Sequence, residues 1–144
     1  MSFMESALVR QVMQEKVVTI SVDDSLSTVE DIMRLGGVRH LPVVRGGRLV
    51  GVVSQNDLLR LSLSTLNSQG DEHRRAFLQA LEVSQAMSSP PIAIEAYATM
   101  EKAAMLMAQH KIGCLPVLDG DDLVGLVTTT DVLSHFAGVH LRSA

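Results

Sequence analysis

Two acidic side chains in this sequence each follow a hydroxyl residue by three positions. Asp57 follows Ser54, and Asp131 follows Thr128. An ionised carboxylate can accept two hydrogen bonds at once, which suits two neighbouring hydroxyl donors. A hydroxyl residue at the start of a helix lies beside free backbone N–H groups, which favour a phosphate. The same spacing also forms a helix capping box, which needs no ligand. Both interpretations stay open, because one aspartate can cap a helix and bind a ligand.

Basic side chains precede a Leu-Pro pair in the first half of the chain. Arg39 and His40 occupy these positions, and a basic pair at the mouth of a cleft could neutralise a phosphate. The alternative is an exposed arginine beside a partly buried histidine, since long basic side chains commonly lie along surfaces. In the second half, Gly113 and Cys114 take these places and carry no charge. We therefore expect one cleft suited to phosphates and a second cleft that is more permissive or empty.

The elements that must position these residues occur twice, 74 positions apart (116 − 42 = 74). The run Leu-Pro-Val at residues 41–43 returns at 115–117, and Leu-Val-Gly at 49–51 returns at 123–125. A duplicated unit usually buries its apolar face on its own copy. The sequence therefore predicts a pseudo-twofold axis with a pair of clefts beside it.

Each half predicts the order strand, helix, strand, strand, helix. β-Branched residues favour a strand, apolar residues at i, i+3 and i+4 favour a helix, and two glycines favour a tight hairpin turn. Ser25 and Thr99 are the expected N-caps of the first helix in each half, and in the first half Ser27 with Glu30 offers a competing capping box. The first half predicts a strand at 17–20, a helix at about 26–35, hairpin strands at 40–45 and 48–53, and a helix that Ser54 opens. The second half predicts a strand at 92–94, a helix from 99 to about 109, hairpin strands at 114–118 and 123–127, and a helix that Thr128 opens. Between the halves we expect a loop at 62–70 and a connecting helix from 71 to about 81.

Composition narrows the class of protein and its partners. With 144 residues, 47% of them hydrophobic, the chain is long enough for one domain with its own core. The net charge of −4 argues against a nucleic-acid partner. The longest apolar run, residues 103–108, is too short to span a bilayer, and the N-terminus lacks the pattern of a signal peptide. The single cysteine, Cys114, fits a reducing compartment. We expect a cytoplasmic protein without nucleic-acid or membrane partners.

Motifs for catalysis or metal binding are missing from the sequence. The five histidines form no metalloprotease-type pair, and Cys114 has no ligand partner nearby in sequence. There is no nucleophile elbow and no phosphate-cradling glycine loop with a lysine. We therefore expect no enzyme activity, no metal site and no catalytic cofactor, and we expect Cys114 to be a small buried hydrophobe.

Taken together, these motifs resemble the cystathionine β-synthase (CBS) domain. The resemblance rests on Met13 and its copy Met87, the β-branched strand, Leu-Pro-Val, the glycine turn, and Leu-Val-Gly-Val-Val-Ser with an acid three residues later. Two such units in tandem resemble a CBS pair, or Bateman module. The resemblance implies an α/β (α+β) fold of two βαββα units with pseudo-twofold symmetry. It places unit 1 at 9–62, a connecting loop and helix at 63–82, and unit 2 at 83–138. In the second copy Lys111 replaces the first glycine of one family signature, and Thr130 is unusual in the other.

The resemblance implies a sensor that binds AMP, ADP, ATP or S-adenosylmethionine as a regulatory ligand and acts through a ligand-dependent conformational change. It implies ribose binding by Asp57 and Asp131, and phosphate or ribose-hydroxyl binding by Ser54, Thr128, Arg39 and His40. The adenine ring would lie against Val18, Thr19, Ile20, Leu41, Pro42, Ile92, Ala93, Ile94, Leu115 and Pro116. A homodimer and an unnamed downstream protein are the implied partners. Two alternatives stay open: a constitutive dimeric protein-interaction scaffold with empty clefts, and a small enzyme that hydrolyses its ligand.

Overall fold

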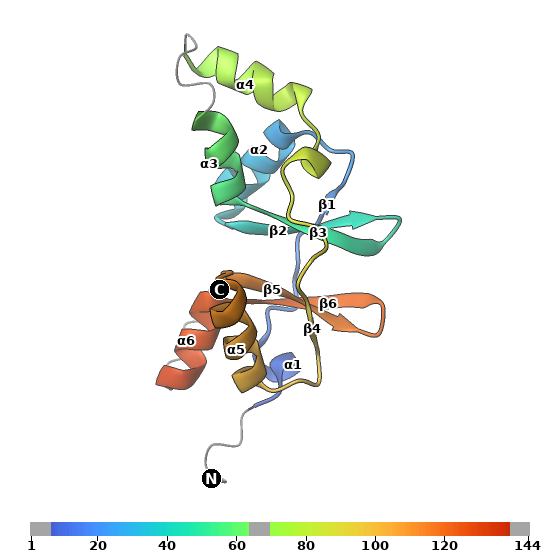
Figure 1. The fold of residues 1–144 in the computed structure, drawn as a ribbon, viewed down its shortest axis with the longest axis vertical. Helices are drawn as coiled ribbons and strands as arrows, with labels where there is room; N and C mark the ends of the chain where they lie inside the picture. Colours follow the sequence, from blue (N-terminus) through green and yellow to red (C-terminus); the bar gives the residue numbers. More distant parts are fainter. Residues whose placement is uncertain (1–6, 64–69, 139–144) are drawn as a thin grey trace. The chain divides into compact units, whose positions relative to one another are not determined.

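The computed structural model describes residues 7–63 and 70–138, which form two compact units (Figure 1). One unit contains residues 18–91, and we call it the central unit. The other joins the segment that ends at Val17 to the residues from Ile92 onward, and we call it the split unit. The expected loop at 62–70 lies mostly outside the described residues.

Both units contain a three-stranded sheet with the same topology. The first strand of each sheet pairs parallel to the second, and the second pairs antiparallel to the third. The central unit comprises β1 (Ile20–Ser21), α2 (Leu26–Gly36), β2 (His40–Arg45), β3 (Arg48–Ser54), α3 (Gln55–Leu63), α4 (Asp71–Ala80) and the 3₁₀ turn η2 (Val83–Gln85). The split unit comprises α1 (Val9–Val12), β4 (Ile94–Glu95), α5 (Met100–His110), β5 (Cys114–Asp119), β6 (Asp122–Thr128) and α6 (Thr129–Ala137). The predicted mixed fold with two βαββα units is confirmed.

The first helix of each repeat begins and ends as its sequence predicts. Ser25 Oγ accepts a hydrogen bond from Thr28 N at 3.3 Å, and Thr99 Oγ1 accepts one from Lys102 N at 3.1 Å, so both predicted N-caps are confirmed. Gly37 ends α2 with φ 65°. Lys111 ends α5 with φ 54°, so the departure from the glycine signature leaves the left-handed helix end intact.

Each sheet packs on the apolar side of its own helices, and Figure 1 shows these helices on one face of the sheet. In the central unit, Leu26, Val29 and Met33 of α2 are buried in the core. In the split unit, Met100, Ala103 and Met107 of α5 take the same places. The helical spacing of apolar residues therefore identifies the buried side of both helices.

The first strand of each sheet is shorter than predicted. β1 begins at Ile20 rather than at residue 17, and β4 begins at Ile94 rather than at residue 92. Ile20 pairs with Val43 of β2. To continue the parallel ladder to the residues before Ile20, the next hydrogen bond would need an N–H from Pro42. Proline has none to donate. Pro116 ends the ladder of β4 in the same way. The predicted strands at 17–20 and 92–94 are therefore wrong in their first residues.

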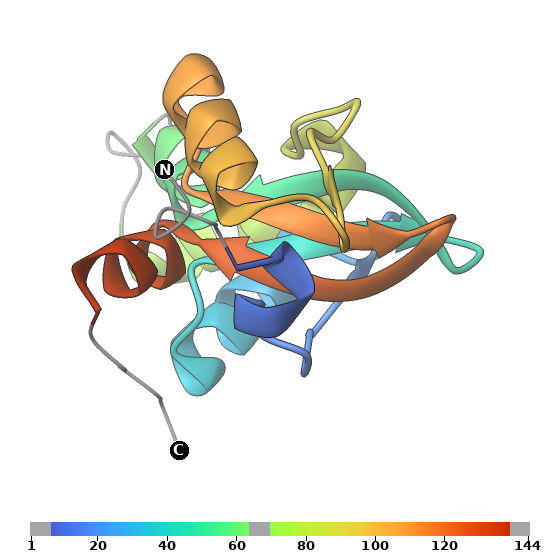
Figure 2. The same cartoon turned by 90° about the horizontal axis from the view of Figure 1, so that it is seen from below.

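A fourth backbone segment pairs with the outer strand of each sheet. Gln14 exchanges two backbone hydrogen bonds with Leu126 of β6, at 2.8 and 3.0 Å. Ser88 exchanges two with Val52 of β3, at 2.8 and 3.1 Å. Figure 2 shows α1 beside the strands of the split unit. Residues 9–17 therefore pack with residues from 92 onward. The predicted unit limits, 9–62 and 83–138, describe the sequence repeat, and they stay a prediction.

We predict that Gly51→Ala lowers the free energy of unfolding by about 1–3 kcal/mol. The new methyl group would be too close to Met87 and Ser88, which pack against β3 at this point. A Cβ on Gly51 would lie 2.6 Å from Met87 Sδ and 2.8 Å from the carbonyl oxygen of Ser88. That backbone oxygen is held by its bond to Val52, so it cannot move freely. The control is Gly36→Ala, whose Cβ meets no atom closer than 3.9 Å. Chemical denaturation should show a loss for Gly51→Ala and almost none for Gly36→Ala; equal losses would contradict the steric argument.

Candidate functional site

The aspartate of the central unit is a nearly buried carboxylate at the start of α3. Asp57 Oδ2 accepts a hydrogen bond from Ser54 N at 2.7 Å, and Ser54 Oγ accepts one from Asp57 N at 3.1 Å. These reciprocal bonds form the capping box that the sequence predicts. Asp57 Oδ1 accepts a third bond from Arg60 Nη2 at 3.0 Å. A carboxylate has about four acceptor positions, so capping leaves room for a ligand hydroxyl.

Three basic side chains accompany Asp57, and with Ser54 they form what we call the central corner. His40 lies opposite Ser54 in the β2–β3 register, and the carbonyl of Arg39 accepts a bond from Gln55 N at 2.8 Å. Arg39 is exposed and His40 is half-buried, as the alternative interpretation of this pair expects. The third base, Arg60, was not singled out from the sequence, although it stands one helical turn after Asp57.

Burial lowers the pKa of His40 below its usual value. The charge of Asp57 works to raise that pKa, and Arg39 lowers it further. The imidazole of the central corner is therefore neutral at pH 7. Because an approaching anion would favour the protonated ring, His40 can take up a proton when a phosphate binds.

The aspartate of the split unit has different partners, and we call this group the split corner. Asp131 Oδ2 accepts bonds from Thr128 N at 2.8 Å, Thr128 Oγ1 at 3.0 Å and Gln14 Nε2 at 3.0 Å. Asp131 Oδ1 has no hydrogen-bond partner among residues 7–63 and 70–138. Gln14 lies 117 positions from Asp131 in the chain, so no local pattern could predict this contact.

The split corner also lacks the cations of the central corner. Gly113 and Cys114 stand where the first repeat has Arg39 and His40, and Ser134 stands where it has Arg60 (134 − 60 = 74). Cys114 is buried, as predicted. Burial, together with the nearby charge of Asp131, raises the pKa of the Cys114 thiol to about 12. The thiol is therefore protonated at neutral pH, and the matched positions of the two corners differ in charge.

The residues expected to contact adenine differ in exposure. Those on β2 and β5 and the first residues of β1 and β4 are buried: Leu41, Pro42, Leu115, Pro116, Ile20 and Ile94. Val18 is 52% exposed and Thr19 is exposed, whereas Ile92 and Ala93 are half-buried. Pro42 and Pro116 have no N–H to donate to the carbonyls of residues 18 and 92. These two carbonyls therefore stay available as hydrogen-bond acceptors where the parallel ladders end.

A small cavity of about 140 Å³ lies in the split unit, between β4, α5 and β5. Its lining residues are Ala93, Ile94, Glu95, Lys102, Leu106 and Leu118. Ligand sites usually measure about 300–1,000 Å³, so this cavity alone would not enclose a nucleotide. Within the described residues, the His, Cys, Asp and Glu side chains form no group of three that could hold a metal ion. No described helix has both the length and the apolar character needed to cross a bilayer.

The family model of the CBS domain matches residues 9–64 and 83–138. The chain belongs to the CBS-domain family. A CBS domain-containing protein of Dictyostelium discoideum is 34% identical to it over 128 residues, which cover 88% of each chain. The CBS fold also appears in two solved complexes. CBSX2 with AMP has 24% identity and a TM-score of 0.75, over 91% of this chain and 96% of that one. A CBS domain pair with 5′-methylthioadenosine and S-adenosyl-L-methionine has 23% identity and a TM-score of 0.76, over 92% of this chain and 98% of that one.

Proposed function

We propose that this CBS-domain protein is a regulatory module that binds an adenosyl compound and changes conformation in response. The observation that carries the proposal is the presence of Asp57 and Asp131 at matched helix starts, each with acceptor capacity left after capping. Two neighbouring ribose hydroxyls can donate to such a carboxylate. Support comes from the solved CBS structures of the same fold that contain AMP, or 5′-methylthioadenosine with S-adenosyl-L-methionine.

Each proposed contact follows from the chemistry of the residue. Asp57 and Asp131 would bind ribose, while Ser54 and Thr128, at their helix starts, would bind a phosphate or a ribose hydroxyl. The carbonyls of residues 18 and 92 would accept hydrogen bonds from the adenine amino group. The apolar residues would contact the ring, and with 3% aromatic residues the chain has to rely on aliphatic side chains. The proposed ring contacts are Val18, Thr19, Ile20, Leu41, Pro42, Ile92, Ala93, Ile94, Leu115 and Pro116.

The charge difference between the two corners gives them different ligand preferences. Arg39, His40 and Arg60 would attract a phosphorylated nucleotide to the central corner. The split corner offers Asp131 with no cation at the matched positions, so repulsion would disfavour a phosphate there. An uncharged or cationic adenosyl compound would suit it better, and S-adenosylmethionine carries a positive sulfonium.

A constitutive dimeric scaffold is the second candidate, and one observation favours a dimer. Leu59 of α3 is 55% exposed, and Leu133 at the matched position of α6 is 64% exposed. Exposed apolar side chains at matched positions of two helices would be covered if the helices of two copies met side by side. We propose a homodimer for both candidates. A cytoplasmic location, a downstream protein partner and the lack of catalysis belong to the same proposal.

Thermal unfolding in the presence of AMP, ADP, ATP, S-adenosylmethionine and NAD separates the two candidates. A ligand that binds the folded state alone raises its stability with the logarithm of concentration, by about 2.7 kcal/mol at 100 times Kd. The sensor proposal expects such a shift with at least one adenosyl compound, and that compound should be recovered unchanged after long incubation. No shift with any compound would favour the scaffold, and hydrolysis of the ligand would favour an enzyme.

We predict that the affinity for ADP rises as the pH falls from 7.5 to 6, because His40 takes up a proton when the phosphates bind. The pKa of His40 lies below its usual value in the free protein, and a bound anion would raise it. Calorimetry in buffers of different ionisation enthalpy would measure the uptake directly. The phosphates of ADP titrate in the same range, so His40→Gln serves as the control that keeps their contribution. An equal pH dependence in His40→Gln and in the parent protein would rule out this role of His40.

A further inference from the structure

The carboxylate of Asp131 in the split corner has its hydrogen-bond donors on one oxygen. Oδ2 accepts bonds from Thr128 N at 2.8 Å, from Thr128 Oγ1 at 3.0 Å and from Gln14 Nε2 at 3.0 Å. A carboxylate oxygen has two lone pairs, so three donors exceed its ordinary capacity. In the part of the chain that the structure describes, Oδ1 has no donor. A ligand therefore finds one oxygen of Asp131 free and the other filled.

Gln14 is the one donor to Asp131 that does not belong to the helix cap. The two bonds from Thr128 are part of the capping box that begins α6, and a helix loses stability without its cap. Gln14 is exposed, and its backbone is held by two hydrogen bonds to Leu126 that do not involve its side chain. The amide of Gln14 can therefore leave Asp131 without disturbing the helix start or the backbone pairing.

The matched positions of the central corner leave both oxygens of Asp57 accessible to donors. Ser88 stands at the position of Gln14 (88 − 14 = 74), and no described hydrogen bond joins its side chain to Asp57. Among the described residues, Asp57 Oδ2 accepts one bond, from Ser54 N at 2.7 Å, and Oδ1 accepts one, from Arg60 Nη2 at 3.0 Å. Each oxygen of Asp57 thus keeps one acceptor position for a ligand hydroxyl.

This difference between the two corners matters for a ribose, which offers two neighbouring hydroxyls. A carboxylate binds such a pair best when each oxygen accepts one hydrogen bond. At Asp131 the first hydroxyl can donate to Oδ1, but the second meets an oxygen that is already filled. A 2′-deoxyribose has one ring hydroxyl, for which Oδ1 is sufficient.

On the basis of the proposed function, we propose that Gln14 is a specificity-determining residue of the split corner. Its side-chain amide competes with the second ribose hydroxyl for Asp131 Oδ2. A ribose gains its second bond to Asp131 only when Gln14 leaves, whereas a 2′-deoxyribose binds with Gln14 in place. Gln14 thereby weakens the preference of the split corner for ribose over 2′-deoxyribose.

The first test measures affinity by titration calorimetry in an Asp57→Ala background, in which Asp131 is the remaining acid of the two corners. Adding Gln14→Ser, the residue of the other repeat, should raise the affinity for 5′-methylthioadenosine about 3- to 10-fold, since one amide hydrogen bond makes a modest net contribution. The affinity for the 2′-deoxy analogue should stay unchanged. Gln79→Ser is the control, because it makes the same side-chain change at an exposed position of α4 and should alter neither affinity.

The outcomes distinguish this inference from the proposed function. If Asp131→Ala abolishes binding in the same background but Gln14→Ser leaves the affinity for 5′-methylthioadenosine unchanged, the ribose assignment stands and competition by Gln14 is wrong. A lower affinity in Gln14→Ser would mean that Gln14 binds the ligand, and an equal gain for the 2′-deoxy analogue would mean that the second hydroxyl is not involved; both results overturn the proposal. If no adenosyl compound binds even to the parent protein, the proposed function fails, and this inference fails with it.

The second test observes the side-chain amide of Gln14 in nitrogen–proton correlation spectra of the Asp57→Ala protein. The signal is identified by its absence in Gln14→Ser, and Asp131→Ala supplies its position without a carboxylate partner. Saturation with 5′-methylthioadenosine should move the signal toward that position, whereas the 2′-deoxy analogue should leave it in place. A signal that stays in place when 5′-methylthioadenosine is saturating would overturn the displacement of Gln14.

Discussion

Asp57→Ala is expected to weaken ADP binding at the central corner by about 100-fold or more. The carboxylate would accept two charge-assisted hydrogen bonds from the ribose, each worth about 1.5–3 kcal/mol, and alanine can accept neither. Titration calorimetry on the folded variant measures the loss. The expected effect exceeds that of removing one arginine from the same corner, because an exposed cation contributes mainly long-range attraction.

Asp57→Ala also removes half of the capping box and the partner of Arg60, so some loss of stability is expected, about 1–2 kcal/mol. Binding must therefore be measured at a temperature well below the transition of the variant. Asp23→Ala is the matched control, because Asp23 is an exposed acid in the turn after β1, and it should bind ADP like the parent protein.

Asp131→Ala completes this comparison because it removes the acid of the split corner. It should leave the affinity for ADP at the central corner unchanged and lower the affinity of the split corner for any adenosyl compound that binds there. If neither Asp57→Ala nor Asp131→Ala weakens the binding of any adenosyl compound while both variants stay folded, the ribose assignment is wrong.

Local sequence signals predicted helices and turns of both units, including the helix starts that carry these acids. Ser25 and Thr99 cap their helices through a hydroxyl three residues before the bonded N–H, and such a cap is visible in a short window of sequence. The glycine pair at 46–47 lies at the hairpin turn, where both residues have positive φ. The capping boxes of Ser54 and Thr128 likewise depend on four consecutive residues. Interactions of this range can be predicted because the chain itself fixes the distance between the partners.

The missed features depend on contacts between distant residues or on a missing donor. Gln14 meets Asp131 because residues 7–17 pack with the second repeat, and nothing in the residues near Gln14 encodes that packing. The strands at 17–20 and 92–94 were predicted too long because β-branched residues describe side-chain preference, whereas Pro42 and Pro116 decide where a backbone partner ends. A strand prediction therefore needs the partner strand as well as the strand itself.

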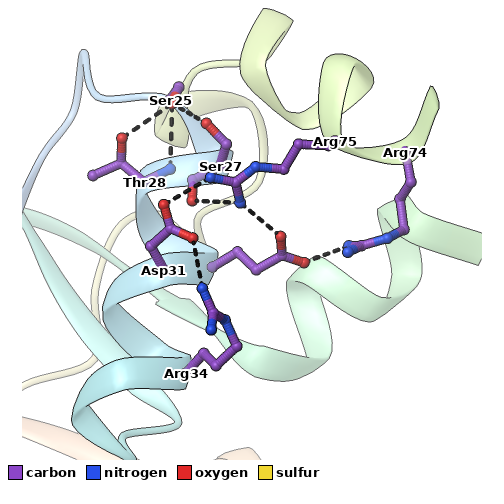
Figure 3. A network of polar contacts seen from close by, with 8 residues as sticks. Ser25, Ser27, Thr28, Asp31, Arg34, Arg74 and Arg75 are labelled. Atoms are coloured by element: carbon purple, nitrogen blue, oxygen red, sulfur yellow. Dashed lines mark hydrogen bonds and ion pairs between the residues drawn. The ribbon is translucent and has the colours of Figure 1, made fainter. Parts of the chain in front are cut away.

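The helix α4 was predicted correctly from local sequence, but its contribution to the stability of the central unit was not. Its limits, Asp71–Ala80, agree with the predicted connecting helix at 71 to about 81. A helix that only joined the two repeats would be peripheral, but Leu78 is as buried as Leu26 and Val29 of α2. Burial of one leucine and the ion pairs that Arg74 and Arg75 form with acids of α2 (Figure 3) make α4 a part of the central unit.

Leu78→Ala should therefore lower the free energy of unfolding by about 2–5 kcal/mol, which is the usual range for a leucine removed from a packed core. The loss combines the transfer of apolar area to water with the cavity that remains, because neighbouring side chains relax in part only. Leu35→Ala is the matched control, since Leu35 of α2 is 77% exposed and the same atoms are removed. Its effect should stay within about 0.5 kcal/mol.

Urea denaturation of the full chain distinguishes two ways in which Leu78→Ala could act. If α4 stays docked through Arg74 and Arg75, the transition shifts to lower urea with an unchanged slope, because the same surface is exposed on unfolding. If the ion pairs cannot hold α4 without the leucine, the slope falls as well, since α4 is already exposed before the transition. We expect the second result, because the side chains of Arg75 and Asp31 are 38% and 36% exposed and such pairs contribute little on their own. A loss no larger than that of Leu35→Ala would mean that α4 adds nothing to the core.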